Sequence, residues 1–85
     1  LKKDSAYFYY LQAEKLYYKL SDFDNFARML FNKAYVLFYD GNYTECEVEI
    51  SKALHYLKGC KDQRLIYSCN TLMGTCLEKL NNYEC

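Results

Sequence analysis

Two sets of polar side chains recur at helical spacing, and together they could hold a short peptide. Between residues 23 and 39, steps of four and three residues place on one helix face Arg28, Asn32, Tyr35 and Tyr39. Between residues 63 and 80, a matching polar face contains Ser68, Thr71, Thr75 and Glu78. An amide can donate to and accept from a peptide bond at once, and tyrosine offers apolar area with a polar tip. The candidate peptide-binding residues are therefore Arg28, Asn32, Tyr35, Ser68, Thr71 and Thr75.

These two faces could instead be ordinary solvated helix surfaces. If they do form one groove, Arg28 is its only cation, and we expect it to bind an acidic side chain or a terminal carboxylate of the peptide. We expect Asn32 to be solvent-accessible and to hold the peptide main chain.

Catalytic chemistry has no comparable pattern in the sequence. The chain has no glycine-rich phosphate loop and no nucleophile elbow, and its single histidine, His55, does not stand beside a nucleophilic residue. The cysteines are Cys46, Cys60, Cys69, Cys76 and Cys85. Their odd number and wide spacing favour reduced thiols over a disulfide framework or a zinc site, and disulfide geometry between helical neighbours is hard to reach. We expect no enzyme activity, no cofactor and no metal.

Length and composition limit the class of protein. The 85 residues are 52% hydrophobic and carry 11 basic and 11 acidic side chains, which suits one folded domain and excludes a disordered tail. Balanced charge also argues against binding to nucleic acid through phosphate contacts. No apolar run approaches the roughly 20 residues that span a bilayer, and no signal peptide or initiator methionine is present. We expect an internal piece of a longer cytoplasmic protein that does not bind membranes.

Four amphipathic helices must position the candidate residues. Apolar spacing predicts helices at about Asp4–Leu20 and Phe23–Tyr39, a third from about Thr44, and a fourth at about Gln63–Leu80. Turns are predicted around Gly41 and Gly59. Short connections make consecutive helices antiparallel neighbours. Expected core residues opposite the polar faces are Leu30, Ala34 and Leu37, and Met73, Leu77 and Leu80.

Capping patterns predict where the second and third helices begin. Ser21 with Asp24 three residues on has the spacing of an N-cap for the second helix. Thr44 with Glu47 has the capping-box spacing for the third.

A shift of 40 residues superimposes small residues on small residues. The matched pairs are Ala6 with Cys46, Ala13 with Ala53, and Ala34 with Gly74. Small residues recurring at a fixed period let helices pack closely and indicate a solenoid of helix pairs, whereas a plain four-helix bundle would make the matches accidental. The pattern Ala34-x-x-Leu37-x-x-x-Gly41-x-Tyr43-x-x-Cys46-x-x-x-Ile50-x-x-Ala53 resembles one tetratricopeptide repeat.

This resemblance implies an all-α, tetratricopeptide-repeat-like right-handed helical solenoid of four antiparallel helices. Residues 1–20 would form the second helix of one repeat, residues 21–60 a complete repeat, and residues 61–85 the first helix of the next. A piece cut in this way leaves apolar ends, so we expect self-association through the helical repeats.

A more specific resemblance runs from about Phe31 to Asn81. The matching segments are Phe31-Asn32-x-Ala34-x-x-Leu37, Asp40-x-x-Tyr43-x-Glu45, Lys52-Ala53, Leu65-Ile66 and Gly74-x-Cys76-Leu77-x-Lys79-Leu80. They resemble the regulatory domain of PlcR-type quorum-sensing transcription activators of Gram-positive bacteria, and are similar also to the related Rap phosphatases. The resemblance implies that an imported signalling peptide binds the concave face.

Only two candidate residues match positions that contact the peptide in this family. Asn32 matches an asparagine that holds the peptide main chain, and Ser68 stands where the family has a longer glutamine. A DNA-binding helix-turn-helix would precede this segment, so DNA would be a partner only through that separate region. The alternatives are a repeat domain of a Rap-type phosphatase and a general protein-interaction scaffold, which the segment before residue 1 would distinguish.

Overall fold

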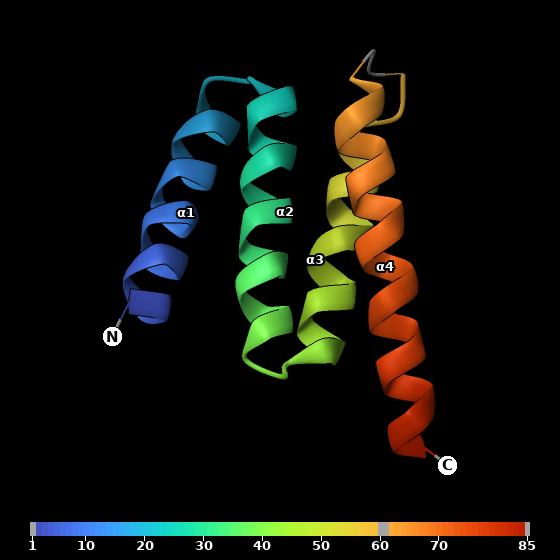
Figure 1. The fold of residues 1–85 in the computed structure, drawn as a ribbon. Helices are drawn as coiled ribbons and strands as arrows, with labels where there is room; N and C mark the ends of the chain where they lie inside the picture. Colours follow the sequence, from blue (N-terminus) through green and yellow to red (C-terminus); the bar gives the residue numbers. More distant parts are fainter. Residues whose placement is uncertain (1, 60–61, 85) are drawn as a thin grey trace.

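Four α-helices form the structure, a computed structural model that describes the backbone of residues 2–59 and 62–84 and the side chains of residues 5–59 and 62–81. The helices are α1 (Lys2–Lys19), α2 (Phe23–Tyr39), α3 (Tyr43–Tyr56) and α4 (Gln63–Glu84). They run antiparallel in chain order (Figure 1), and no strand occurs in these ranges. The prediction of an all-α chain with four antiparallel helices is confirmed.

The helices form an open layer. α2 packs against α1 and α3, and α4 packs against α3 and touches α2 over a smaller area. Between their described residues α1 and α4 share no contact, and the molecule measures 42 × 33 × 16 Å. A closed four-helix bundle would bring the first and last helices together. The alternative of a plain four-helix bundle therefore does not describe this arrangement.

The two turns that flank α2 have the same backbone geometry. In the first, the amide of Asp22 donates to Tyr17, and in the second the amide of Asn42 donates to Leu37. Gly41 adopts the left-handed conformation at φ 83° that the second turn requires, as predicted. Ser21 takes the equivalent position in the first turn at φ 58°, which L-residues with a side chain adopt at a cost.

Both capping predictions need correction. Asp22, not Ser21, is the N-cap of α2, and its carboxylate accepts from the amide of Asn25 at 3.4 Å. α3 begins at Tyr43 after Asn42, so Thr44 already lies inside the helix and no capping box forms there. The turn geometry ends at Asn42, which places the start of α3 before the Thr44 pattern.

The core lies between α2, α3 and α4. Its buried apolar residues are Phe26, Ala27, Leu30, Ala34, Leu37, Cys46, Ile50, Ala53, Leu57, Leu65, Cys69, Leu72 and Cys76. At the end of the layer near the first turn, the ring of Tyr56 contacts Phe26 and Phe23 at 4.8 and 5.5 Å between centroids. The ring of Tyr18 contacts Phe26 at 5.1 Å, which ties α1 into the same cluster.

Burial on α4 and α1 differs from prediction. α4 buries Leu65, Cys69, Leu72 and Cys76, whereas Leu77 is 43% exposed and Gly74 is exposed with open space around it. Among the described residues no helix covers that face. Amphipathicity was also predicted for α1 and is wrong there, because Phe8, Tyr9 and Leu16 point to solvent while Tyr7 and Tyr17 pack inward.

A buried lysine links the first three helices. The Nζ atom of Lys33 on α2 lies 2.5 Å from Oε1 of Glu14 on α1 and 3.0 Å from Oε1 of Glu49 on α3. Burial lowers the pKa of Lys33, but the two carboxylates outweigh that effect and raise it overall. The side chain is 4% exposed, so the ammonium is held by this pair and by the ring face of Tyr7.

Candidate functional site

Two adjoining hollows lie between α2 and α4. The first, which we name the aromatic hollow, has a volume of about 310 Å³ and is lined by Phe31, Tyr35, Phe38, Tyr67, Ser68, Thr71, Leu72 and Thr75. The second, the charged hollow, has a volume of about 430 Å³ and is lined by Arg28, Phe31, Asn32, Asp62, Arg64, Leu65 and Ser68. Phe31 and Ser68 belong to both, so the hollows form one continuous groove.

The structure brings all six candidate residues into this groove. Tyr35, Ser68, Thr71 and Thr75 line the aromatic hollow, and Arg28, Asn32 and Ser68 line the charged hollow. Tyr39 and Glu78, which continue the two predicted polar faces, line neither. The α2 and α4 faces meet because both helices pack against α3, which holds them side by side.

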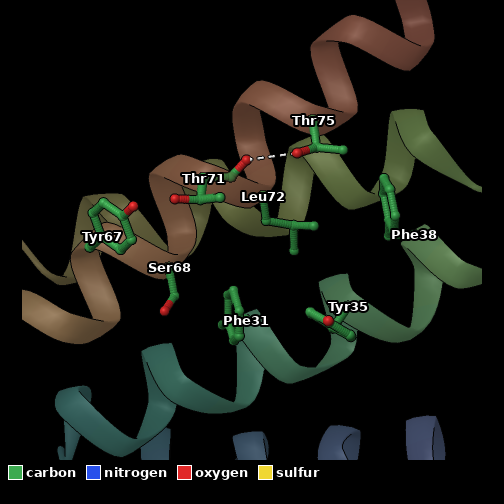
Figure 2. A pocket seen from close by; sticks show the side chains of 8 residues that line it. All are labelled: Phe31, Tyr35, Phe38, Tyr67, Ser68, Thr71, Leu72 and Thr75. Atoms are coloured by element: carbon green, nitrogen blue, oxygen red, sulfur yellow. Dashed lines mark hydrogen bonds between the residues drawn. The ribbon is translucent and has the colours of Figure 1, made fainter.

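Aromatic and aliphatic side chains form the floor of the aromatic hollow. Figure 2 shows Phe31 and Tyr35 on α2 facing Ser68 and Leu72 on α4. Tyr67, at the rim, is 73% exposed. Such a surface suits an apolar side chain of a ligand, because binding would remove apolar area of both the protein and the ligand from water.

The hydroxyl groups of this hollow are partly engaged by their own helices. Oγ1 of Thr75 donates to the carbonyl oxygen of Thr71 at 3.1 Å (Figure 2), which leaves the Thr75 oxygen free to accept. The hydroxyls of Tyr35 and Tyr39 lie 3.3 Å apart. This hydrogen bond raises the pKa of Tyr35, so the phenol stays neutral and can serve as a hydrogen-bonding group at physiological pH.

In the charged hollow, Arg28 already has a carboxylate partner. Its Nη2 atom lies 2.9 Å from Oδ2 of Asp62, whose Oδ1 accepts from the amide of Leu65 at the start of α4. Arg28 is also not the only cation, because Arg64 lines the same hollow. The expectation that Arg28 is the only cation of the groove is therefore wrong, whereas its pairing with a carboxylate of a bound peptide stays a prediction. Asp62 is 34 residues away in sequence, and helical spacing alone does not pair such residues.

Asn32 and Arg64 are polar groups of the charged hollow that are available to a ligand. Asn32 is half-buried, and its side-chain amide makes no hydrogen bond within the described residues. Arg64 is exposed and has no ion-pair partner there. The hollow can thus offer both hydrogen-bonding ends of an amide together with a guanidinium, a set that suits a peptide bond and a carboxylate.

Sequence reasoning missed the apolar lining of the groove. Phe31 and Phe38 stand seven residues apart beside the polar face of α2, and Tyr67 and Leu72 flank the polar face of α4. The sequence shows these apolar residues at helical spacing. Such spacing, however, indicates a buried core as readily as a ligand-binding surface. Only the packing of α2 and α4 on α3 decides which of them remain accessible.

Among the residues that the structure describes, no group of three metal-ligating side chains occurs. Over the same residues, no helix combines the length and the hydropathy needed to cross a membrane. Comparison with known proteins finds no matching family model, no significantly similar curated protein and no significantly similar solved structure.

Proposed function

We propose that this chain is part of a tetratricopeptide-repeat-like right-handed solenoid that binds a short signalling peptide between α2 and α4. In this proposal it is the regulatory region of a PlcR-like quorum-sensing transcriptional regulator in the cytoplasm. DNA would be bound by a separate region, and the helical repeats would mediate self-association.

The observation that carries this proposal is the groove itself. Six residues that were predicted from sequence spacing line two connected hollows, and both hollows lie between α2 and α4. Peptide-binding surfaces commonly combine apolar pockets for side chains with a few placed polar groups for the main chain. The open layer of antiparallel helices is compatible with a solenoid, since each helix packs on its chain neighbours.

The chemistry of the two hollows suggests how the peptide would lie. An apolar side chain would enter the aromatic hollow between Phe31 and Leu72. The amide of Asn32 would hold a neighbouring peptide bond, and Arg64 would bind an acidic side chain or the terminal carboxylate. Arg28 would keep its contact with Asp62 and position the start of α4.

Replacing Asn32 by Ala tests this arrangement. In the full-length protein we expect the affinity for a bound peptide to fall by about 5- to 150-fold, equivalent to about 1–3 kcal/mol, because a peptide amide or carbonyl loses its partner. The probe is a fluorescent library of synthetic pentapeptides to heptapeptides that carry apolar residues and a free carboxyl terminus, followed by fluorescence anisotropy. The free energy of unfolding should stay nearly unchanged, since the amide makes no hydrogen bond within the described residues.

Asn70→Ala is the matched control, because Asn70 is an exposed asparagine on α4 that lines neither hollow. It should leave peptide affinity unchanged. Equal affinities for wild type and Asn32→Ala would remove Asn32 from the site. A library in which no peptide binds wild type would contradict the peptide-binding function itself.

A further inference from the structure

Two buried thiols from different helices lie in contact. Cys76 on α4 donates to Cys46 on α3, with 2.8 Å between the two Sγ atoms, and neither residue is accessible to solvent. The sulfurs of a disulfide lie about 2.05 Å apart, so they need to approach by only about 0.8 Å to bond. Cys46, Cys69 and Cys76 are free in the structure, as expected of reduced thiols, but the contact brings one pair much nearer to bonding distance than helical spacing indicates.

We propose that Cys46 and Cys76 form an oxidisable dithiol, which a disulfide-containing oxidant converts into a cross-link between α3 and α4. This site is independent of peptide binding. The third described cysteine, Cys69, is also buried and free, but no thiol contacts it within the described residues. Of the three described cysteines, only Cys46 and Cys76 are therefore placed to form a disulfide with each other.

The reaction is a two-step thiol–disulfide exchange. One thiol of the pair loses its proton, attacks a sulfur of the oxidant and forms a mixed disulfide, which releases the first thiol of the oxidant. The second cysteine then loses its proton and attacks the mixed disulfide, which releases the other thiol. In total the protein gives up two protons and two electrons, and the oxidant's disulfide is reduced to two thiols.

Burial makes this reaction depend on opening of α4. Burial raises the pKa of both thiols, and for Cys46 the contact with Cys76 raises it further, so both are protonated and inert in the closed structure. α4 also has an uncovered face, where Leu77 and Gly74 are exposed. Partial separation of α4 from α3 would expose the pair to the oxidant, and bond formation would then hold the helices together.

The test uses the full chain with only this pair of cysteines retained, through the changes Cys60→Ser, Cys69→Ala and Cys85→Ser. After incubation with oxidised glutathione, mass spectrometry should find a mass lower by two hydrogens and a linked pair of peptides that contain Cys46 and Cys76. The melting temperature should rise by about 10 °C, since the cross-link constrains the unfolded chain, and dithiothreitol should reverse both effects.

The matched control retains Cys46 and Cys69 and replaces Cys76 by Ala. It can accept at most two glutathiones, one on each retained cysteine, and should form no internal disulfide. If the retained pair stops at a glutathione adduct, stays unmodified or closes with a lower melting temperature, the proposal is wrong. The same peptide mapping on the oxidised wild type guards against a variant that fails to fold, and a Cys46–Cys76 link must appear there as well.

Discussion

The helices α2 and α4 correspond under the 40-residue shift, yet residues at corresponding positions of the two helices are buried to different extents. Ala34 on α2 is fully buried, whereas its counterpart Gly74 on α4 is exposed. Leu37 is 6% exposed, and its counterpart Leu77 is 43% exposed. α2 packs between α1 and α3, whereas α4 packs on α3 and touches α2 over a smaller area. The number of neighbouring helices, more than residue type, therefore decides which positions belong to the core.

The number of neighbouring helices also determines where α2 carries a buried charged side chain. α2 carries Lys33 on its enclosed side, where two carboxylates from neighbouring helices neutralise it, and Met73 takes the corresponding position on α4. On its groove side α2 carries Arg28, whose ion pair with Asp62 stays partly in water. A buried cation requires a paired carboxylate, which the helices on either side of α2 supply to Lys33, while an exposed cation can remain solvated by water.

The largest expected effect comes from removing the buried cation. Lys33→Ala should reduce the free energy of unfolding by about 3–5 kcal/mol, because the half-buried Glu14 would lose its cation and Glu49 would keep only its contact with the exposed Lys52. Urea denaturation followed by circular dichroism measures the loss. Lys52→Ala is the control, since Lys52 contacts the same Glu49 at 3.2 Å but is 51% exposed, and it should cost at most about 1 kcal/mol. Equal losses would contradict the role of burial.

Substitution of Leu37 on α2 and of Leu77 on α4 directly tests the difference in burial between the two helices. Leu37→Ala should cost about 2–5 kcal/mol, because it leaves a cavity among buried neighbours, while Leu77→Ala should cost less than about 1 kcal/mol. The two substitutions remove the same atoms at positions that correspond under the repeat. Similar losses in urea denaturation would mean that α4 is covered on that side, for instance by a second copy of the chain.

The smallest effect is expected at Gly74, and it has the opposite sign. Gly74→Ala should raise the free energy of unfolding of the 85-residue chain by about 0.5–1 kcal/mol, because alanine favours a helix and an added methyl group meets no neighbour. Thermal denaturation of the two chains measures the gain. A loss of stability would contradict the open space at Gly74. In the full-length protein, a loss would instead identify a helix packed on this face, as the solenoid proposal predicts.

Helix positions followed from local patterns of the sequence. The bounds of α2 match the prediction at both ends, since Gly41 provides the left-handed turn and apolar spacing marks the buried face. The start of α3 was misplaced because Thr44 and Glu47 satisfy a capping pattern that the preceding turn makes unnecessary. The six groove residues were found because polar side chains at helical spacing share a face whatever the tertiary structure.

What spacing could not supply was the pairing of distant residues. Arg28 with Asp62, Cys46 with Cys76 and Lys33 with both carboxylates are contacts between helices. They depend on how the helices are placed against each other, and a single sequence carries no local signal for that placement. The sequence by itself determined the four helices, the turns at Gly41 and Gly59, and the polar faces of α2 and α4. Tertiary packing decided which faces are covered, because burial requires a neighbour and only the fold supplies one.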